Sequence, residues 1–523
     1  MHQKIVLSIV LIVGLICALI VGINIGTADY EQMAIYAAIA CSIYFVVHGW
    51  KNVWWVVALL IFSGATFKHS FDFDARHLFT ILIVCASVIS FINHNRVPTE
   101  PLPLLRAGSR ITAILMALLL AYGGIHFIVY YTFPYSPTDY LWKSSTKAYF
   151  QAFAPIFCFL WLLSGSYTFR LKPNWSKLLV GIIFLCLLAN IAVMAVMFHL
   201  GYSDADDLFV DPRDYSLYVP LIKLAPSIYT LRALCPAATV LVLMIATSPG
   251  WWASVGKLSK LTVILAIPAI IAGSIYSGGR ATPIFCVVLA VCVALKRKKI
   301  HLVAVISCIG ALLAAGANIF SHEINTKAPV AIARSMQLVM VDKSDLAYGS
   351  VTHSQDSRTA AFHEAIDLWR KDNRVLFFGR SVFGITQTEL LKSRYEGIDE
   401  FVDTAVRTGA THNLLTDLLL QYGLTGCTLY LLGFVFVIRF FWRLSKAIPP
   451  SEPLSRSLAE AMAIYLPLLL IGSLLGGGFL PMEAALIIGL IRASILQSVG
   501  SREAAANPII ISESQLPVNS NIK

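Results

Sequence analysis

Long apolar runs constrain this chain more than any other feature of its sequence. Hydrophobic residues make up 57% of the 523 positions and charged residues only 13%, a balance far from that of water-soluble domains. About 20 apolar residues cross the hydrocarbon core of a bilayer as a helix, whereas a membrane barrel needs polar and apolar residues in alternation, which these runs lack. The sequence therefore predicts an all-α, polytopic integral membrane protein.

About 14 apolar runs can be distinguished, which gives room for about 12–14 transmembrane helices. The first run follows Lys4 and has no small-residue cleavage site at its end, so we expect a retained span rather than a secretory signal. The short third run and the closely spaced last pair carry the weakest signals. The runs lie near residues 5–25, 33–49, 53–66, 78–93, 111–132, 149–169, 176–199, 226–247, 258–277, 280–296, 300–320, 412–438, 458–477 and 479–498.

These runs divide the chain into five parts. They are N-terminal transmembrane helices (1–257), transmembrane helices that carry a Ser-Gly-Gly-Arg turn (258–320), one long outer loop (321–411), C-terminal transmembrane helices (412–498) and a cytoplasmic tail (499–523). Within the outer loop, residues 359–371 have the spacing of an amphipathic helix with Phe362, Ile366 and Trp369 on its apolar face. The apolar patch at 376–380 fits either a lid over a lipid-linked substrate or a loop resting on the bilayer.

The distribution of lysine and arginine orients the spans, because cytoplasmic loops carry the excess of positive charge. The strongest such signal is Lys296-Arg297-Lys298-Lys299, and placing it inside puts both termini inside as well. The acidic run 204–214 and the loop 321–411 then lie outside. The loop 321–411 has eleven Lys and Arg residues against twelve Asp and Glu residues, so the formal net charge of +11 comes from the rest of the chain. This positive charge suits an anionic inner leaflet, so we expect membrane lipids as partners and no nucleic acid.

The turn Ser277-Gly278-Gly279-Arg280 lies between two predicted spans at the outer edge. Its glycines allow a tight turn, Pro283 suits the first turn of the next helix, and exposed amides beside Arg280 would form an anion site. A guanidinium there can bind a phosphate with two parallel hydrogen bonds. The alternative is an interfacial arginine that reaches toward lipid phosphates.

His412 stands at the start of a later span. We expect Thr411 to be the N-cap and His412 to lie in the first helical turn, with Gln421 to Gly426 further along the same helix. The helix dipole would lower the pKa of the imidazole and favour its neutral form, so that it can act as a base. The alternative is an interfacial histidine with a structural role. Asp417 could orient His412 or complement the dipole.

Three further charged residues are candidates. Arg358, in Asp356-Ser357-Arg358 just before the amphipathic helix, offers a second outer guanidinium or a solvated loop charge. Arg232 and Glu483 lie within apolar runs, where an ionisable group is a functional candidate by default. They could also pair with each other for stability. We favour a structural role for both, with Arg232 the better candidate because it lies nearer the outer end.

Taken together, these features resemble the O-antigen ligase and polymerase superfamily. The resemblance covers about residues 260–445, a third of the chain: the arginine turn, two spans, a long outer loop with Ser357-Arg358, then His412-Asn413 followed by Gly423 and Gly426. The commoner ligase form often has Ser-Arg-Gly at the turn, whereas here Gly278-Gly279 precede Arg280. This departure concerns the backbone of the turn and leaves the cation in place.

The resemblance implies a GT-C-like, metal-independent glycosyltransferase in the bacterial inner membrane, with its active site and the long loop facing the periplasm. Such an enzyme takes a glycan from undecaprenyl diphosphate and needs neither a nucleotide sugar nor another cofactor. Arg280 and Arg358 would neutralise the diphosphate, and His412 would accept the proton of the acceptor hydroxyl. Arg232, Gly279 and Asn413 would complete the substrate-binding residues.

The acceptor stays open between lipid A-core, as in an O-antigen ligase, and another lipid-linked glycan, as in a polymerase. The His412 pattern resembles the ligase branch better, whereas the span count and chain length suit a polymerase. Transfer to a protein hydroxyl ranks third. A lipid or polysaccharide transporter is the alternative from another class; it would need charges along a central cavity and would not depend on His412.

Overall fold

A computed structural model of the chain shows a predominantly helical protein. It describes residues 65–67, 103–130, 141–143, 175–199, 217–219, 222–224, 228–254, 256–328, 330–337, 339–341, 345–380, 385–386, 398–409, 411–476, 484, 487–489, 491–492 and 495. The helical prediction is confirmed for these parts.

The helices are α5 (Pro103–Tyr130), α7 (Trp175–His199), α8 (Ile228–Ala246), α9 (Pro249–Ser254), α10 (Lys257–Tyr276), α11 (Ala281–Lys296), α12 (Ile300–Ile319), α13 (Ser321–Lys327), α14 (Val330–Met336), α15 (Asp345–Lys371), α16 (Asn373–Phe378), α18 (Ile398–Thr408), α19 (Leu414–Ala447) and α20 (Pro453–Gly476). Five very short strands accompany them. Antiparallel strands β1 (Ala65–Phe67), β4 (Ile222–Leu224) and β3 (Leu217–Val219) form one sheet, and β2 (Leu141–Lys143) pairs with β5 (Ile385–Thr386).

Among the described residues, four helices are long and apolar enough to cross a membrane: Ser259–Tyr276 within α10, α12, α19, and Pro453–Leu474 within α20. Shorter apolar helices run through α5, α7, α8 and α11. Eight of the expected runs therefore coincide with helices, because a helix satisfies its backbone hydrogen bonds within the segment and needs no polar surroundings. The expected runs before residue 94, apart from residues 65 and 66 in β1, and those at 149–169 and most of 479–498, lie outside the described residues.

Helix α8 lies at the centre of one group of packed helices. It packs against α7, α10, α11 and α20, and Leu231, Leu234, Val240 and Leu241 are buried. Gly273 of α10 lets that helix approach α8 closely, because a Cβ atom at this position would lie 2.9 Å from the sulfur of Cys235. A second contact region joins α19 to α20 and α5.

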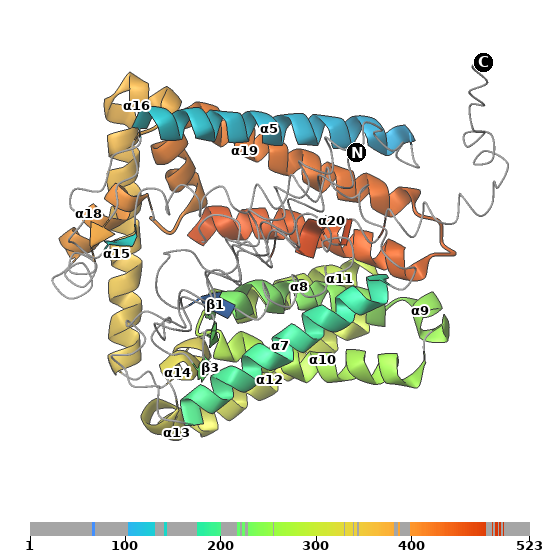
Figure 1. Cartoon of the computed structure of the whole chain (residues 1–523). Helices are drawn as coiled ribbons and strands as arrows, with labels where there is room; N and C mark the ends of the chain where they lie inside the picture. Colours follow the sequence, from blue (N-terminus) through green and yellow to red (C-terminus); the bar gives the residue numbers. More distant parts are fainter. Residues whose placement is uncertain are drawn as a thin grey trace, which may run out of the picture.

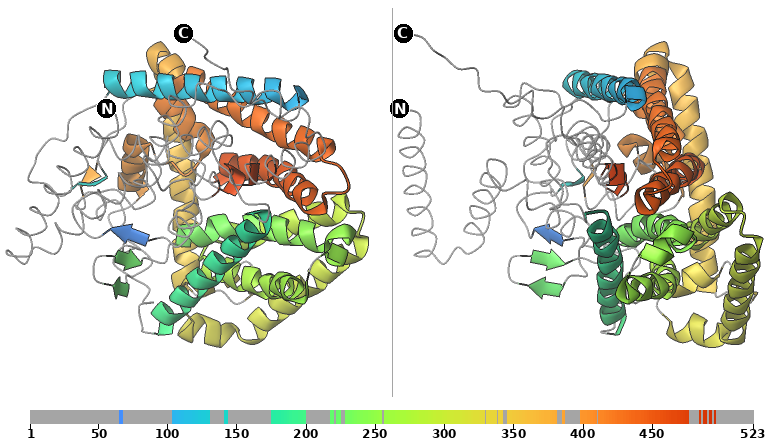
Figure 2. Two further views of the ribbon diagram at one scale, coloured as in Figure 1. Left: turned by 45° about the vertical axis from the view of Figure 1, so that its right-hand side comes forward. Right: turned by 90° about the vertical axis from the view of Figure 1, so that its right-hand side faces the viewer.

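The long helices alternate in direction between two ends of the molecule, and α15 lies crosswise at one of them (Figure 1). Helices α8, α11 and α19 begin at the α15 end, whereas α10, α12 and α20 finish there. Figure 2 shows the same crosswise course of α15 from two other directions. The turn 277–280 and the start of α19 thus share one end, and the basic run 296–299 lies at the other.

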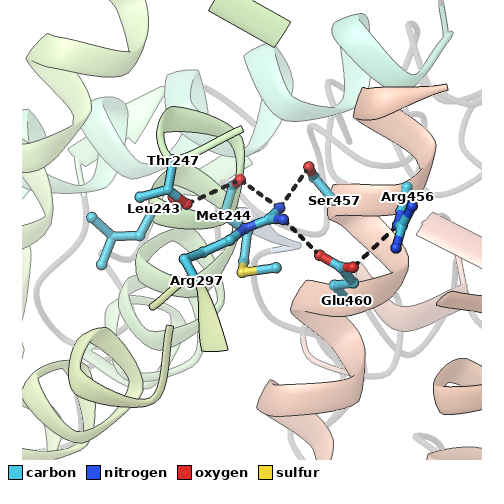
Figure 3. Close-up of polar contacts among 7 residues, drawn as sticks. All are labelled: Leu243, Met244, Thr247, Arg297, Arg456, Ser457 and Glu460. Carbon is cyan, nitrogen blue, oxygen red and sulfur yellow. Dashed lines mark hydrogen bonds and ion pairs between the residues drawn. The ribbon is translucent and has the colours of Figure 1, made fainter. Parts of the chain in front are cut away.

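An ion-pair cluster joins α8, α11 and α20 at that opposite end (Figure 3). Arg297 Nη1 lies 3.1 Å from Glu460 Oε2, and its Nη2 donates to the Met244 carbonyl at 3.2 Å and to Ser457 Oγ at 3.1 Å. Arg456 Nε lies 3.3 Å from Glu460 Oε1. The sequence places Arg297 in a basic run between two spans, but its side chain bonds to helices α8 and α20.

The described parts of the segment 321–411 are largely helical, in α13 to α16 and α18. The expected amphipathic helix at 359–371 is present, but it begins earlier, at Asp345. The prediction that Arg358 precedes this helix is therefore wrong. Ser357, Ala361 and Ala365 are buried at a spacing of four residues, and α15 packs against α18 and α19.

Candidate functional site

The Ser-Gly-Gly-Arg turn has the tight geometry expected from its glycines. Gly278 has φ of 61°, in the region that residues with a side chain rarely adopt. Ser277 is fully buried and its hydroxyl donates to the Ser274 carbonyl at 2.7 Å, while Pro283 lies in the first turn of α11. The amides of Gly278 and Thr282 bond to carbonyls of Ile275 and Gly279, so part of the expected row of exposed amides is used within the turn.

Arg232 of α8 reaches this turn. Its Nε donates to the Ser277 carbonyl at 3.1 Å. A Cβ atom at residue 279 would lie 2.8 Å from that same Nε and 3.0 Å from Thr282 Oγ1, so only glycine leaves room for the arginine. The structure thus brings together Arg232, Gly279 and the turn that ends in Arg280. Glu483, the other partner considered for Arg232, lies outside the described residues.

Arg280 itself is half-buried at the boundary between the turn and α11. Burial lowers the pKa of its guanidinium from the ordinary 12.5. Arginine nevertheless keeps its proton in proteins, so Arg280 supplies a lasting positive charge at this position. The sequence signal for Arg280 was local, whereas nothing local indicated that Arg232 would meet the same turn.

His412 does not lie in the first turn of the helix, as was predicted, but before it. Its φ is 62°, unusual for a residue with a side chain. The side chain is exposed and its ring stacks on Phe401 of α18, with ring centroids 6.3 Å apart and planes within 6° of parallel. The imidazole is therefore presented at the surface between α18 and α19.

The N-cap of α19 is Asn413 rather than the predicted Thr411. Asn413 Oδ1 accepts hydrogen bonds from the amides of Leu415 at 2.9 Å and Thr416 at 3.3 Å. Its Nδ2 donates to the Leu474 carbonyl of α20 at 2.8 Å, which joins the start of α19 to a helix that also packs on α8 and α11. Asparagine is the stronger capping residue, and this preference could have located the cap. The substrate-binding role expected of Asn413 stays a prediction.

Thr411 has another partner, the buried carboxylate of Asp417. Asp417 Oδ1 accepts from the Thr411 amide at 2.8 Å and from its hydroxyl at 2.6 Å. The carboxylate, which we considered as an orienting group for His412, thus holds the residue immediately before it.

The helix α19 breaks at Gly423, where φ is 62° and ψ is −171°. The end of α16 fits against this break: a Cβ atom at Gly423 would lie 2.4 Å from the Phe377 carbonyl carbon, and one at Gly379 would lie 2.1 Å from the Gln421 carbonyl oxygen. The Tyr122 hydroxyl of α5 lies 2.9 Å from the Phe378 carbonyl oxygen and 2.8 Å from that of Tyr422. Residues 421–426 thus lie along α19 as predicted, but the sequence did not indicate the break at Gly423.

The apolar patch at 376–380 is attached to the core through this junction. The Arg380 amide donates to the Leu420 carbonyl at 2.9 Å, and its guanidinium bonds to the Val406 carbonyl. Burial lowers the pKa of Arg380, and the nearby Asp403 and Glu364 carboxylates raise it. Phe377 and Phe378 remain 47% and 52% exposed, so the patch combines a fixed backbone with exposed aromatic rings.

Arg358 projects from the exposed face of α15, the helix that crosses the end where Arg280 and His412 lie. Its neighbour Ser357 is buried against the packing face. The structure thus places Arg358 on a helix that packs against α19.

Within the described residues, no group of three or more His, Cys, Asp and Glu side chains is placed to hold a metal ion. The candidate residues Arg232, Arg280, Arg358 and His412 lie on elements at this end of the described structure, three guanidinium cations and one imidazole among other charged side chains. Such an arrangement can bind an anion and accept a proton. A comparison of the chain with protein-family models and with curated protein sequences found no match.

Proposed function

We propose that this chain is a membrane glycosyltransferase of the O-antigen ligase and polymerase superfamily, with a GT-C-like arrangement of helices. It moves a glycan from undecaprenyl diphosphate to an acceptor hydroxyl on the periplasmic face of the bacterial inner membrane. We favour the ligase activity, with lipid A-core as the acceptor. The observation that carries the proposal is the hydrogen bond from Arg232 to Ser277, which brings a second guanidinium to the turn of Arg280.

Two neighbouring guanidinium groups suit a diphosphate leaving group. When the bond between the anomeric carbon and the diphosphate oxygen breaks, negative charge grows on that oxygen. Fixed cations stabilise this charge without reorganising, and losing one such donor typically lowers the rate about 10²–10³-fold. In this proposal Arg232 and Arg280 bind the diphosphate from α8 and the turn, and Arg358 approaches from α15.

In this proposal the imidazole of His412 is the general base. The acceptor oxygen attacks the anomeric carbon as its proton passes to His412, and undecaprenyl diphosphate leaves. Asn413 connects the backbone beside His412 to α20, which packs on the two helices that carry Arg232 and follow Arg280. This connection supports a base and an anion site that act in one transfer reaction, the base on the acceptor and the cations on the donor.

The proposal is tested with purified protein in detergent, an undecaprenyl-diphosphate-linked glycan and lipid A-core. We expect Arg280→Ala, Arg358→Ala and His412→Ala to lose transfer while the proteins remain folded. Arg370→Ala is the matched control for Arg358, because Arg370 is another exposed arginine of α15. Wild-type turnover in His412→Ala would remove the base from the mechanism, and unchanged transfer in all three variants would contradict the enzyme proposal as a whole.

Deleting the gene separates the two acceptors. Uncapped lipid A-core together with long glycan chains left on the carrier identifies a ligase. Lipid A-core capped with single repeats identifies a polymerase. If the deletion abolishes glycan export but His412→Ala does not, the result would instead support a transporter.

A further inference from the structure

His412 has a backbone conformation that its surroundings must maintain. A φ of 62° places a residue with a Cβ atom in the left-handed region, and such a conformation costs on the order of 1–3 kcal/mol. Left alone, this residue would relax to negative φ and its imidazole would move. The residues on either side of it therefore determine where the imidazole lies.

Thr411, on one side, is held by Asp417. Thr411 and Asp417 are 1% and 2% exposed. One carboxylate oxygen of Asp417 accepts both the amide of Thr411, at 2.8 Å, and its hydroxyl, at 2.6 Å. Burial shields both hydrogen bonds from water, which strengthens them.

Asn413, on the other side, is held by the first turn of α19. Its carbonyl accepts the amide of Asp417 at 3.0 Å and the hydroxyl of Thr416 at 3.0 Å. The hydroxyls of Thr411 and Thr416 lie 2.6 Å apart. Asp417 thus bonds to the residue before His412 through its side chain and to the residue after it through its backbone.

We propose that Asp417 is a positioning residue for His412, acting through the backbone of Thr411 to keep the imidazole at the surface against Phe401. This inference rests on the proposed role of His412 as the base. Without the carboxylate, the buried amide of Thr411 loses its acceptor and its hydroxyl keeps only the contact with the Thr416 hydroxyl, so the left-handed conformation of His412 loses support.

Two substitutions of similar size separate the role of the Asp417 side chain as a hydrogen-bond acceptor from the role of its volume. Asp417→Asn keeps an oxygen that can accept from Thr411, whereas Asp417→Leu keeps the bulk without an acceptor. We expect Asp417→Leu to lower kcat about 10²-fold, as a displacement of about 1 Å in a catalytic group can do, with the KM for the lipid-linked donor unchanged. Asp417→Asn is expected to restore most of the turnover. Thr411→Val, which removes only the hydroxyl, is the milder variant and is expected to lower kcat less than Asp417→Leu.

The same substitutions in a His412→Ala background distinguish positioning from general damage. If Asp417 acts through His412, Asp417→Leu causes no further loss once the imidazole is gone. An equal fold-loss in both backgrounds, or equal KM and kcat effects, would overturn the inference.

A measurement without substrate keeps the test independent of the proposed function. The rate at which diethyl pyrocarbonate modifies His412 is followed by mass spectrometry of the full-length protein, with the exposed His301 of α12 as the internal reference. We expect a several-fold change at His412 in Asp417→Leu and none at His301. An unchanged rate at His412 would refute the role of Asp417 even where transfer depends on His412. A changed rate in a protein whose transfer ignores His412 would instead contradict only the proposed function.

Discussion

Arg232 Nε lies 3.1 Å from the carbonyl oxygen of Ser277, so a cation near the start of α8 bonds to the turn between α10 and α11. The two residues are 45 positions apart in the chain. This contact gives Arg232 a defined place next to Arg280 and gives Gly279 a physical reason to be glycine. It also makes the arginine turn testable by substitutions that do not touch Arg280.

Replacing Arg232 should lower transfer from the lipid-linked donor more than it lowers the stability of the fold. We expect Arg232→Ala to lower kcat/KM about 10²-fold, because one charge-stabilising donor is lost. Arg232→Lys keeps the charge but loses the fixed fork of donors, so it should recover only part of the activity. Steady-state transfer rates measure both. Wild-type rates in Arg232→Ala would mean that this arginine serves only to close the turn.

Gly279→Ala should act through Arg232. The added Cβ would lie 2.8 Å from Arg232 Nε, so the arginine must shift although the backbone of residue 279 needs no unusual φ. We expect transfer to fall about tenfold, the change that 1.4 kcal/mol of lost transition-state stabilisation produces. Gly310→Ala is the control, because a Cβ there meets nothing within 4 Å. Equal activity of the two variants would show that Arg232 adapts without cost.

Gly423→Ala should destabilise the protein itself. The new Cβ would meet the backbone of Phe377 at 2.4 Å, and residue 423 has positive φ. Backbone cannot swing aside as a long side chain can, so we expect a loss of stability above about 1–3 kcal/mol. The midpoint of thermal unfolding in detergent measures it. Gly316→Ala, in an open part of α12, should leave the midpoint unchanged or raise it, and a matching loss there would contradict the explanation.

The two arginines beside Glu460 should differ in their contribution to stability. Arg297 is 20% exposed and Arg456 is 40% exposed. An ion pair open to solvent contributes about 0–1 kcal/mol, whereas breaking a buried pair costs more because the remaining charge stays uncompensated. Arg297→Met should therefore lower the unfolding midpoint clearly more than Arg456→Met. Equal midpoints would show that Glu460 is supported by either arginine alone.

The sequence by itself predicted the membrane class and the positions of eight described helices: α5, α7, α8, α10, α11, α12, α19 and α20. Apolar runs of sufficient length specify helices locally, since each helix satisfies its own backbone. The turn at Gly278 was also predictable from the local sequence, because glycine adopts positive φ readily. Arg280, His412 and Arg358 could be selected as candidates from their residue types and their places at the ends of runs.

Only the tertiary structure decided which of these residues meet. The Arg232–Ser277 contact, the Arg297–Glu460 pair and the break of α19 against Phe377 join segments that are remote in sequence. The left-handed conformation of His412 likewise lies between residues that Asp417 holds. Local periodicity specifies a helix and its apolar face, but it holds no information on which distant backbone carbonyl will accept a partly buried guanidinium, because that depends on how the helices pack.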